Sequence, residues 1–268
     1  MSSIRKRTDT PGPSPNFVQS LARGLSVIEA MGQSGGPLTL SATASATGLS
    51  RAAARRLLLT LGDLGYVRVD GRQFSLTPRV LRLGYSFLSS LPLAQVVVPH
   101  LERLVEEIHE SSSVSVLDGE EIVYVARVPT KRIIAVNLSV GTRLPAYVTS
   151  MGRVLLAALS ECELDAYLGR TRLVARTGRT VTDPAELRRV LLGVAQKGYA
   201  LVDQEFEEGL RSVAVPLHDR HGRVLAAMNV SGHASHVSRT QLQKEILPRL
   251  QAAAAAADAS LHPSSGHR

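Results

Sequence analysis

The first apolar residues that recur at helical spacing predict an amphipathic helix near the start of the chain. Leu21, Leu25 and Ile28 share one side of this helix, which is expected to begin near Phe17. The pattern ends at residues 32–37, a stretch rich in glycine and ending in proline that does not favour a helix.

Two further helical patterns follow, over residues 42–47 and 51–61. Ser41 and Ser50 precede them, and serine is a common cap at a helix N-terminus. Gly48 lies between the two patterns, where its permissive backbone allows a sharp turn. Two helices joined in this way are typical of a helix-turn-helix.

The second of these helices has two chemically different sides. Ala54, Leu57, Leu58 and Leu61 fall at i, i+3, i+4 and i+7, so we expect them to face the core. The opposite side and the N-terminal end carry Arg51, Ala52, Arg55 and Arg56. A helix end that presents arginines suits the major groove, where guanidinium groups reach guanine edges and phosphates. The N-terminus beside Ser50 could also hold a phosphate.

A β-hairpin is predicted directly after these helices. Residues 66–69 and 73–76 have strand-like patterns and flank Asp70-Gly71, a dipeptide favoured in tight turns. Arg68 and Arg72 would lie at this hairpin, where they can reach backbone phosphates. Helix, helix, turn, helix and hairpin in this order predict a winged helix-turn-helix domain.

A linker helix is expected next. Thr77 is placed as an N-cap with Pro78 at the first helical position, and the helix would continue to about Leu88. Its large apolar surface favours packing against the same helix of a second subunit, and packing on its own chain is the alternative.

Strand-like and helical patterns alternate beyond residue 92. We expect strands at residues 113–117, 122–128, 133–138, 199–203, 212–217 and 224–230. We expect helices at residues 96–108, 152–158 and 185–196, and a final helix capped by Ser238. Antiparallel strands enclosed by helices predict an α+β domain.

Basic residues are concentrated in the first ninety residues, which carry a net charge of +7 against +1 for the remainder. Such a local positive field attracts polyanions. Arg5-Lys6-Arg7 and three prolines predict a flexible basic arm over residues 1–16 that can touch phosphates. No apolar run fits a membrane span or a secretory signal, so a cytoplasmic protein with no membrane partner is expected. The single cysteine, Cys162, is expected to be a semi-buried packing residue.

The chain resembles the IclR-type regulators from Phe17 to about Leu261. The resemblance is carried by residues 40–61, 136–145 (VNLSVGTRLP), 149–157 (TSMGRVLLA), 203–212 (DQEFEEGLRS) and 229–231 (NVS). Within that family, residues 17–23, 50–56 and 89–93 are most similar to the Pca/Pob-type regulators of aromatic-acid and β-ketoadipate catabolism.

This resemblance implies a GAF-like effector domain, an antiparallel sheet flanked by helices. It implies homo-oligomers, either a dimer or a dimer of dimers, and a small organic-acid effector, either an aromatic acid or an oxoadipate-like acid. The partner is expected to be double-stranded operator DNA, and a contact with RNA polymerase is compatible with this function. The expected organisation is a basic arm (1–16), winged helix-turn-helix (17–77), linker helix (78–92), effector domain (93–262) and disordered tail (263–268). The residues expected to contact DNA are Thr39, Ser41, Ser50, Arg51, Ala52, Arg55, Arg56, Arg68 and Arg72.

The expected effector site begins where a helix opens at residues 149–152, because free amide groups and the helix dipole favour a carboxylate. Arg143 or Arg211 is expected to add a guanidinium to the acid. For each of these two arginines, an ion pair with the acidic run Glu205, Glu207 and Glu208 is the alternative. With the pocket residues that the resemblance supplies, the expected set is Arg143, Thr149, Ser150, Met151, Gly152, Asp203, Arg211, Ser212, Asn229 and Ser231.

Two other classes of protein stay open at this point: an enzyme tethered to nucleic acid, and an architectural DNA binder without a ligand. The sequence lacks the motifs of nucleophile elbows, dinucleotide loops and phosphate loops, so no cofactor and no catalytic residue are expected. His233 and His236 have metal-like spacing but no third ligand nearby, so no metal site is expected. A triad of Ser212, His218 and Asp219 has little support but would depend on geometry. Protocatechuate, 4-hydroxybenzoate and β-oxoadipate are alternatives for the effector, and neither activation nor derepression is favoured.

Overall fold

A computed structural model describes residues 14, 16–83, 93–130 and 138–261. The chain divides into two compact units, residues 1–87 and 88–268, and each is described by itself. Most of the expected basic arm, the linker helix beyond Leu83, nearly all of the strand expected at 133–138 and the tail at 263–268 lie outside the described residues.

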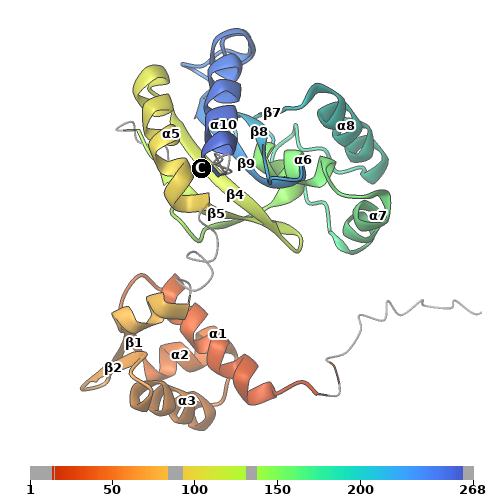
Figure 1. Ribbon diagram of the computed structural model, residues 1–268. Helices are drawn as coiled ribbons and strands as arrows, with labels where there is room; N and C mark the ends of the chain where they lie inside the picture. The colour runs from red at the N-terminus through yellow and green to blue at the C-terminus, as the bar shows by residue number, and fades with distance from the viewer. Residues whose placement is uncertain (1–13, 15, 84–92, 131–137, 262–268) are drawn as a thin grey trace, which may run out of the picture. The chain divides into compact units, whose positions relative to one another are not determined.

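The N-terminal unit packs three helices and a small antiparallel sheet around one core (Figure 1). The helices are α1 (Gln19–Gln33), α2 (Leu40–Thr47) and α3 (Arg51–Asp63). The strands are β1 (Leu38–Thr39), β2 (Val67–Asp70) and β3 (Gln73–Leu76), in the order β1-β3-β2. The buried core consists of Val27, Met31, Leu58, Leu61, Val67 and Phe74. The prediction of a winged helix-turn-helix is confirmed.

The turn between α2 and α3 forms through the residues that the sequence indicated. Gly48 has a φ of 65°, in the left-handed region where glycine carries no steric penalty. Ser50 caps α3, because its side-chain oxygen accepts a hydrogen bond of 3.2 Å from the amide of Ala53.

The prediction that Ser41 caps α2 is wrong. The helix begins at Leu40, and the side chain of Thr39 accepts the capping hydrogen bond from the amide of Ala42. The physical reason is that Thr39 also ends β1, where it pairs with Gln73 of the hairpin. Extended backbone therefore gives way to helix two residues earlier than the serine suggested.

The start of the linker segment also forms as the sequence predicts. The Thr77 side chain accepts a hydrogen bond from the amide of Arg79, and Pro78 opens the short 3₁₀ turn η1 (Pro78–Val80). Residues 81–83 continue as helix, with Leu81 and Leu83 exposed.

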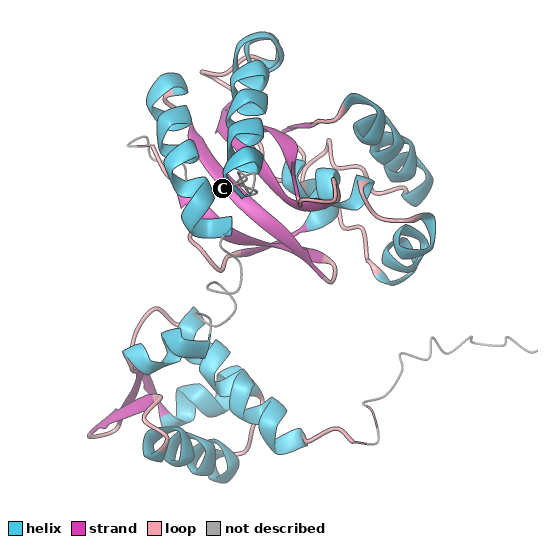
Figure 2. Ribbon diagram, in the orientation of Figure 1, coloured by secondary structure: helices cyan, strands magenta, loops and turns pink. Residues whose placement is uncertain are grey.

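The C-terminal unit is built on a six-stranded antiparallel sheet covered by helices on both faces (Figures 1 and 2). The strands are β4 (Ser111–Asp118), β5 (Glu121–Val128), β6 (Arg143–Pro145), β7 (Ala200–Asp203), β8 (Leu210–His218) and β9 (Val224–His233), in the order β6-β5-β4-β9-β8-β7. The helices are α5 (Leu93–Ile108), α6 (Ser150–Ala157), α7 (Glu161–Arg170), α8 (Pro184–Lys197), α9 (Arg239–Gln241) and α10 (Leu247–Leu261), with short turns η2 (Ala146–Val148) and η3 (Leu242–Ile246).

The two faces of this sheet differ in side-chain size because successive strand residues point to opposite sides. On β9, Met228 and Val230 pack in the core under α5 and α10. Ala227 belongs to the other core, under α6, and Asn229 and Ser231 share its face by alternation. The side that α6 covers is therefore lined with small residues, which leaves room between helix and sheet.

Some elements were not predicted from the sequence. Helix α7 begins with a capping box, in which Ser160 accepts from the Glu163 amide and the Glu163 carboxylate accepts from the Ser160 amide. That serine-to-glutamate spacing was a usable signal. The expectation that Cys162 is semi-buried is wrong: it is exposed in the first turn of α7. The buried side of this helix is formed by Leu164 and Tyr167 instead.

Gly152 lets the first turn of α6 lie directly against η2. A Cβ atom at this position would lie 2.1 Å from the Ala146 carbonyl oxygen and 2.4 Å from its Cα atom. Real Cβ atoms essentially never approach so closely, and backbone cannot move aside as a flexible side chain can. Glycine at 152 is therefore required for the position of α6.

A buried ion pair connects α6 to the loop after β7. Arg153, 3% exposed, donates from both terminal nitrogens to the two carboxylate oxygens of Glu205, over 2.7 and 2.5 Å. Its Nε also donates to the Tyr147 carbonyl over 2.9 Å. This geometry uses the planar guanidinium fork fully.

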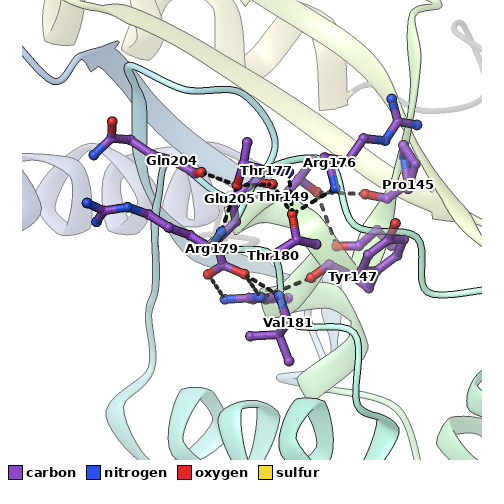
Figure 3. A network of polar contacts seen from close by, with 12 residues as sticks. Pro145, Tyr147, Thr149, Arg176, Thr177, Arg179, Thr180, Val181, Gln204 and Glu205 are labelled. Atoms are coloured by element: carbon purple, nitrogen blue, oxygen red, sulfur yellow. Dashed lines mark hydrogen bonds and ion pairs between the residues drawn. The ribbon is translucent and has the colours of Figure 1, made fainter.

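The loop after β7 is also held by hydrogen bonds from the segment between α7 and α8 (Figure 3). Thr177 donates to the Gln204 carbonyl and Thr180 to the Glu205 carbonyl, each over 2.7 Å. The amide of Val181 donates to the Glu205 carboxylate over 3.3 Å. Loop, helix and connecting segment are thus held by one polar network.

Replacing Gly152 with alanine should destabilise the C-terminal unit by about 3 kcal/mol or more, because the new methyl group overlaps backbone. Gly193→Ala in α8 is the matched control: nothing lies within 4 Å of the new Cβ, so a gain of about 0.5–1 kcal/mol is expected. Urea unfolding followed by circular dichroism measures both. Equal stability of the two variants would contradict the close approach.

Arg153→Met should lower the free energy of unfolding by about 3–5 kcal/mol, because Glu205 would stay buried without its counter-ion. The control is Arg188→Met, which breaks the exposed pair with Asp165 and should cost less than about 1 kcal/mol. The same urea titration compares them. A loss for Arg153→Met no larger than the control would show that the pair does not hold the loop.

Candidate functional site

The outer side of α3 presents an arginine-bearing surface in the N-terminal unit. Arg51, Arg55 and Arg56 are exposed, whereas Ala54 and Leu58 on the opposite side are fully buried. All nine residues expected to contact DNA are exposed: Thr39, Ser41, Ser50, Arg51, Ala52, Arg55, Arg56, Arg68 and Arg72. This surface is therefore free within its unit to meet a partner.

The wing is a tight hairpin with a two-residue loop. Asp70 pairs with Gln73, so Gly71 and Arg72 form the tip, and Gly71 has a φ of 58°. A positive φ at the first loop residue suits the hairpin turns that match strand twist. Arg72 is at the exposed tip, and Arg68 is exposed on β2.

The C-terminal unit contains an internal pocket between α6 and the small-residue face of the sheet. About 580 Å³ of empty space, which includes space open to solvent, lies among its lining side chains. The lining residues are Tyr124, Arg127, Leu138, Leu144, Val148, Thr149, Ser150, Met151, Val202, Phe206, Leu210, Ser212, Asn229 and Ser231. The wall is mostly apolar with a few polar groups, as ligand pockets generally are.

Six of the ten residues expected to bind an effector line this pocket: Thr149, Ser150, Met151, Ser212, Asn229 and Ser231. The structure therefore brings the start of α6 together with β8 and β9. Thr149 caps α6 by accepting from the Gly152 amide over 3.1 Å. Gly152 itself is not in the wall, and its role is the close packing described above.

Arg143, Asp203 and Arg211 do not line the pocket. Arg143 lies on the exposed edge strand β6 and pairs with Asp118 and Glu121, each over 2.7 Å. These partners are not in the acidic run that the sequence suggested. Asp118 ends β4 and Glu121 begins β5, on either side of the turn between these strands, so only the folded sheet brings them beside β6.

Arg211 pairs with Asp203 over 2.6 Å, at the paired position on the neighbouring strand β7. Burial alone would raise the pKa of Asp203, but hydrogen bonds from Arg211 and Gln204 outweigh it and hold the pKa of this carboxyl below its usual value. The acidic run contributes Glu205 instead to Arg153, a pairing that the sequence did not indicate.

Arg127 lines the pocket and was missed by the sequence analysis. Tyr124 and Arg127 are three residues apart on β5, so plain alternation would place them on opposite faces. The pairing with β4 shifts by one residue here: Ser115 pairs with Tyr124, whereas Ser113 pairs with Arg127. This β-bulge turns both side chains toward the pocket, an effect no local sequence signal revealed.

Arg127 is the only charged residue among those described in the pocket wall. It is half-buried, and it donates to the Ser113 side chain over 3.2 Å. Burial lowers the pKa of its guanidinium, with a smaller opposing effect from Tyr124, but an arginine stays protonated. Burial also raises the pKa of the Tyr124 hydroxyl to about 12, which keeps that group neutral.

Two buried polar atoms at the pocket have no hydrogen-bond partner among the described residues. They are the Ser150 hydroxyl oxygen, at the start of α6, and the amide oxygen of Asn229, on β9. Both residues are more than nine-tenths buried. Buried polar atoms are usually hydrogen-bonded, so an unsatisfied pair facing a cavity indicates a place for a polar ligand group.

The catalytic alternative is not supported by geometry. Ser212 and His218 lie six residues apart on the same strand, about 20 Å along it. His218 is bonded to Asp258 and Asp219 to Arg223, so no triad forms from them. His233 and His236 have ring centroids 6.0 Å apart, and in the described parts of the chain no three metal-binding side chains come together. Nor does any helix described here have the length and apolar character to cross a membrane.

Comparison with known proteins finds a family match for each of the two units. Residues 20–71 match the IclR helix-turn-helix domain, and residues 85–259 match the family described as bacterial transcriptional regulator IclR C-terminal. The chain is 48% identical over 254 residues to the Pca regulon regulatory protein of Pseudomonas putida, covering 94% of this chain and 87% of that protein.

Solved structures of similar proteins agree with this match. A transcriptional regulator from Rhodococcus sp. RHA1 is 52% identical, with a TM-score of 0.81 over 91% of this chain and 98% of that one. An IclR homolog from Microbacterium hydrocarbonoxydans complexed with 4-hydroxybenzoate is 26% identical, with a TM-score of 0.79 over 91% of this chain and all of that one. These relatives are regulators and not enzymes, and the match spans the two units described above. The chain belongs to the IclR family of bacterial transcriptional regulators.

Proposed function

We propose that this protein binds operator DNA through α3 and the wing, and that a small organic acid in the α6 pocket controls this binding. The observation that carries the first part is the exposed arginine-bearing side of α3, opposite a buried leucine side. In a winged helix-turn-helix, this is the surface that enters the major groove. Arg68 and Arg72 at the wing position the protein through phosphates.

In this proposal, the effector is an acid that belongs to the catabolism of aromatic acids. Its support is the similarity to the Pca regulon regulatory protein and to the homolog complexed with 4-hydroxybenzoate. The chain's own pocket adds independent support, because it combines apolar walls with one arginine and unsatisfied hydroxyl and amide groups. A ligand that prefers one DNA-bound geometry would shift the equilibrium toward it.

The protein is proposed to act as a homo-oligomer on a pseudo-palindromic site, with RNA polymerase as a further partner where it activates. Exposed apolar side chains just before α1 (Phe17 and Val18) and on it (Leu21 and Leu25) support association of two N-terminal units. A two-fold arrangement of recognition helices matches the symmetry of such an operator.

Arg55→Ala should reduce the preference for operator over random duplex by about tenfold, because a guanidinium fork that reads a base edge is lost. Arg249→Ala, which removes an exposed arginine from α10, is the control and should leave the preference unchanged. Gel-shift titrations at several salt concentrations measure this, and wild-type affinity should fall steeply with salt. Equal wild-type affinity for operator and random duplex would refute sequence-specific binding.

An aromatic acid should raise the melting temperature, because at a concentration about one hundred times its dissociation constant it stabilises the folded protein by about 2.7 kcal/mol. A thermal-shift screen of protocatechuate, 4-hydroxybenzoate and β-oxoadipate tests this. Ser231→Leu fills the pocket and should abolish the shift, whereas Ser235→Leu, in the exposed loop four residues on, should keep it. A shift that survives in Ser231→Leu would place the ligand elsewhere.

A further inference from the structure

We propose that Arg127 binds the carboxylate of the effector and that Ser150 and Asn229 bind a hydroxyl group at its other end. This assigns the effector to the hydroxyaromatic monocarboxylic acids. The inference rests on the proposed effector function of the pocket and makes Arg127 its specificity-determining residue.

The first step is the balance of charge. Within the described chain, no carboxylate lies within ion-pairing distance of Arg127, and its one hydrogen bond there runs from a terminal nitrogen to Ser113. Among the other arginines near the pocket, Arg153 is paired with Glu205 and Arg211 with Asp203. Arg176 is exposed, and its guanidinium lies 5.6 Å from the ring centroid of Phe206. A half-buried cation with free donors is satisfied best by an anionic ligand group.

The second step concerns the neutral polar groups of the pocket. Ser150 and Asn229 offer an unsatisfied hydroxyl and an unsatisfied amide oxygen, and apart from Arg127 none of the described lining residues is charged. A hydroxyl group can donate to the Asn229 amide oxygen and accept from the Ser150 hydroxyl at once. A second carboxylate would meet the Asn229 amide without a cation to compensate it, so a dicarboxylic acid fits less well.

The third step is the distance between the two ends. Arg127, Ser113 and Asn229 are paired in register across β5, β4 and β9, so Arg127 and Asn229 are two strand spacings apart. This is about 10 Å between backbones. Only the small Ser113 lies between them, which leaves space for a ring over the sheet. Leu144, Val148 and Phe206 supply apolar contacts for such a ring.

The test is isothermal titration of the full chain with four probes: 4-hydroxybenzoate, its neutral analogue 4-hydroxybenzamide, benzoate and adipate. For the wild type, 4-hydroxybenzoate should bind about tenfold or more tightly than the amide, because charge-assisted hydrogen bonds are lost. It should also bind more tightly than benzoate, which lacks the hydroxyl, and than adipate, which has two carboxylates.

The variants separate Arg127 from the rest of the pocket. Arg127→Gln should remove the preference for acid over amide while leaving amide binding nearly unchanged, and Arg127→Lys should keep part of the preference. Asn229→Ala should remove the preference for 4-hydroxybenzoate over benzoate. Arg143→Gln, which alters an exposed arginine outside the pocket, is the matched control and should behave as the wild type.

Each contrary outcome has a distinct meaning. If folded Arg127→Gln keeps the wild-type acid preference, or if adipate binds more tightly than 4-hydroxybenzoate, the assignment is overturned while the proposed effector function stands. If none of the probes binds the wild type, both fall. Should Arg127→Gln not fold, equal affinity of the wild type for acid and amide still overturns the assignment without any substitution.

Discussion

The architecture of the C-terminal unit depends on how closely α6 approaches the sheet. The helix can pack against η2 only because residue 152 is glycine, with no Cβ to collide with the Ala146 backbone. Beneath the helix, the sheet carries small side chains, those of Ala214, Ala227 and Ser113, which occupy little volume. Close packing of the first turn of α6 against η2, together with small residues on the sheet beneath the helix, leaves an internal space instead of a filled core.

The buried Arg153–Glu205 pair then fixes the walls of that space. Arg153 follows the lining residues at the start of α6, and Glu205 precedes Phe206, which also lines the pocket. Removing two charges from water is costly and is offset here by a bidentate geometry with further hydrogen bonds. Because helix and loop are already ordered, a ligand that enters between them loses less affinity to ordering the protein.

Local patterns predicted the N-terminal unit well because its structure follows local rules. The Ser50 cap, the Gly48 turn, the hairpin and the buried side of α3 each depend on residues within a few positions. Thr39 shows where such reasoning fails, since a pairing with the distant residue Gln73 moved the helix start. In the C-terminal unit, ion partners such as Asp118 for Arg143 come from other strands, and periodicity does not reveal them.

The pocket's cation is the clearest case of a feature hidden from the sequence. Six lining residues were expected, yet the arginine was sought at 143 or 211, and the acid at the start of α6. Alternation along β5 assigns Arg127 to the wrong face, and only the register shift beside Val125 brings it to the same face as Tyr124. A bulge adds one residue to one strand and leaves the rest of the sheet in register. One such insertion is enough to put a positive charge in the same pocket as the neutral groups of Ser150 and Asn229, so that a ligand meets one charged and two neutral polar partners.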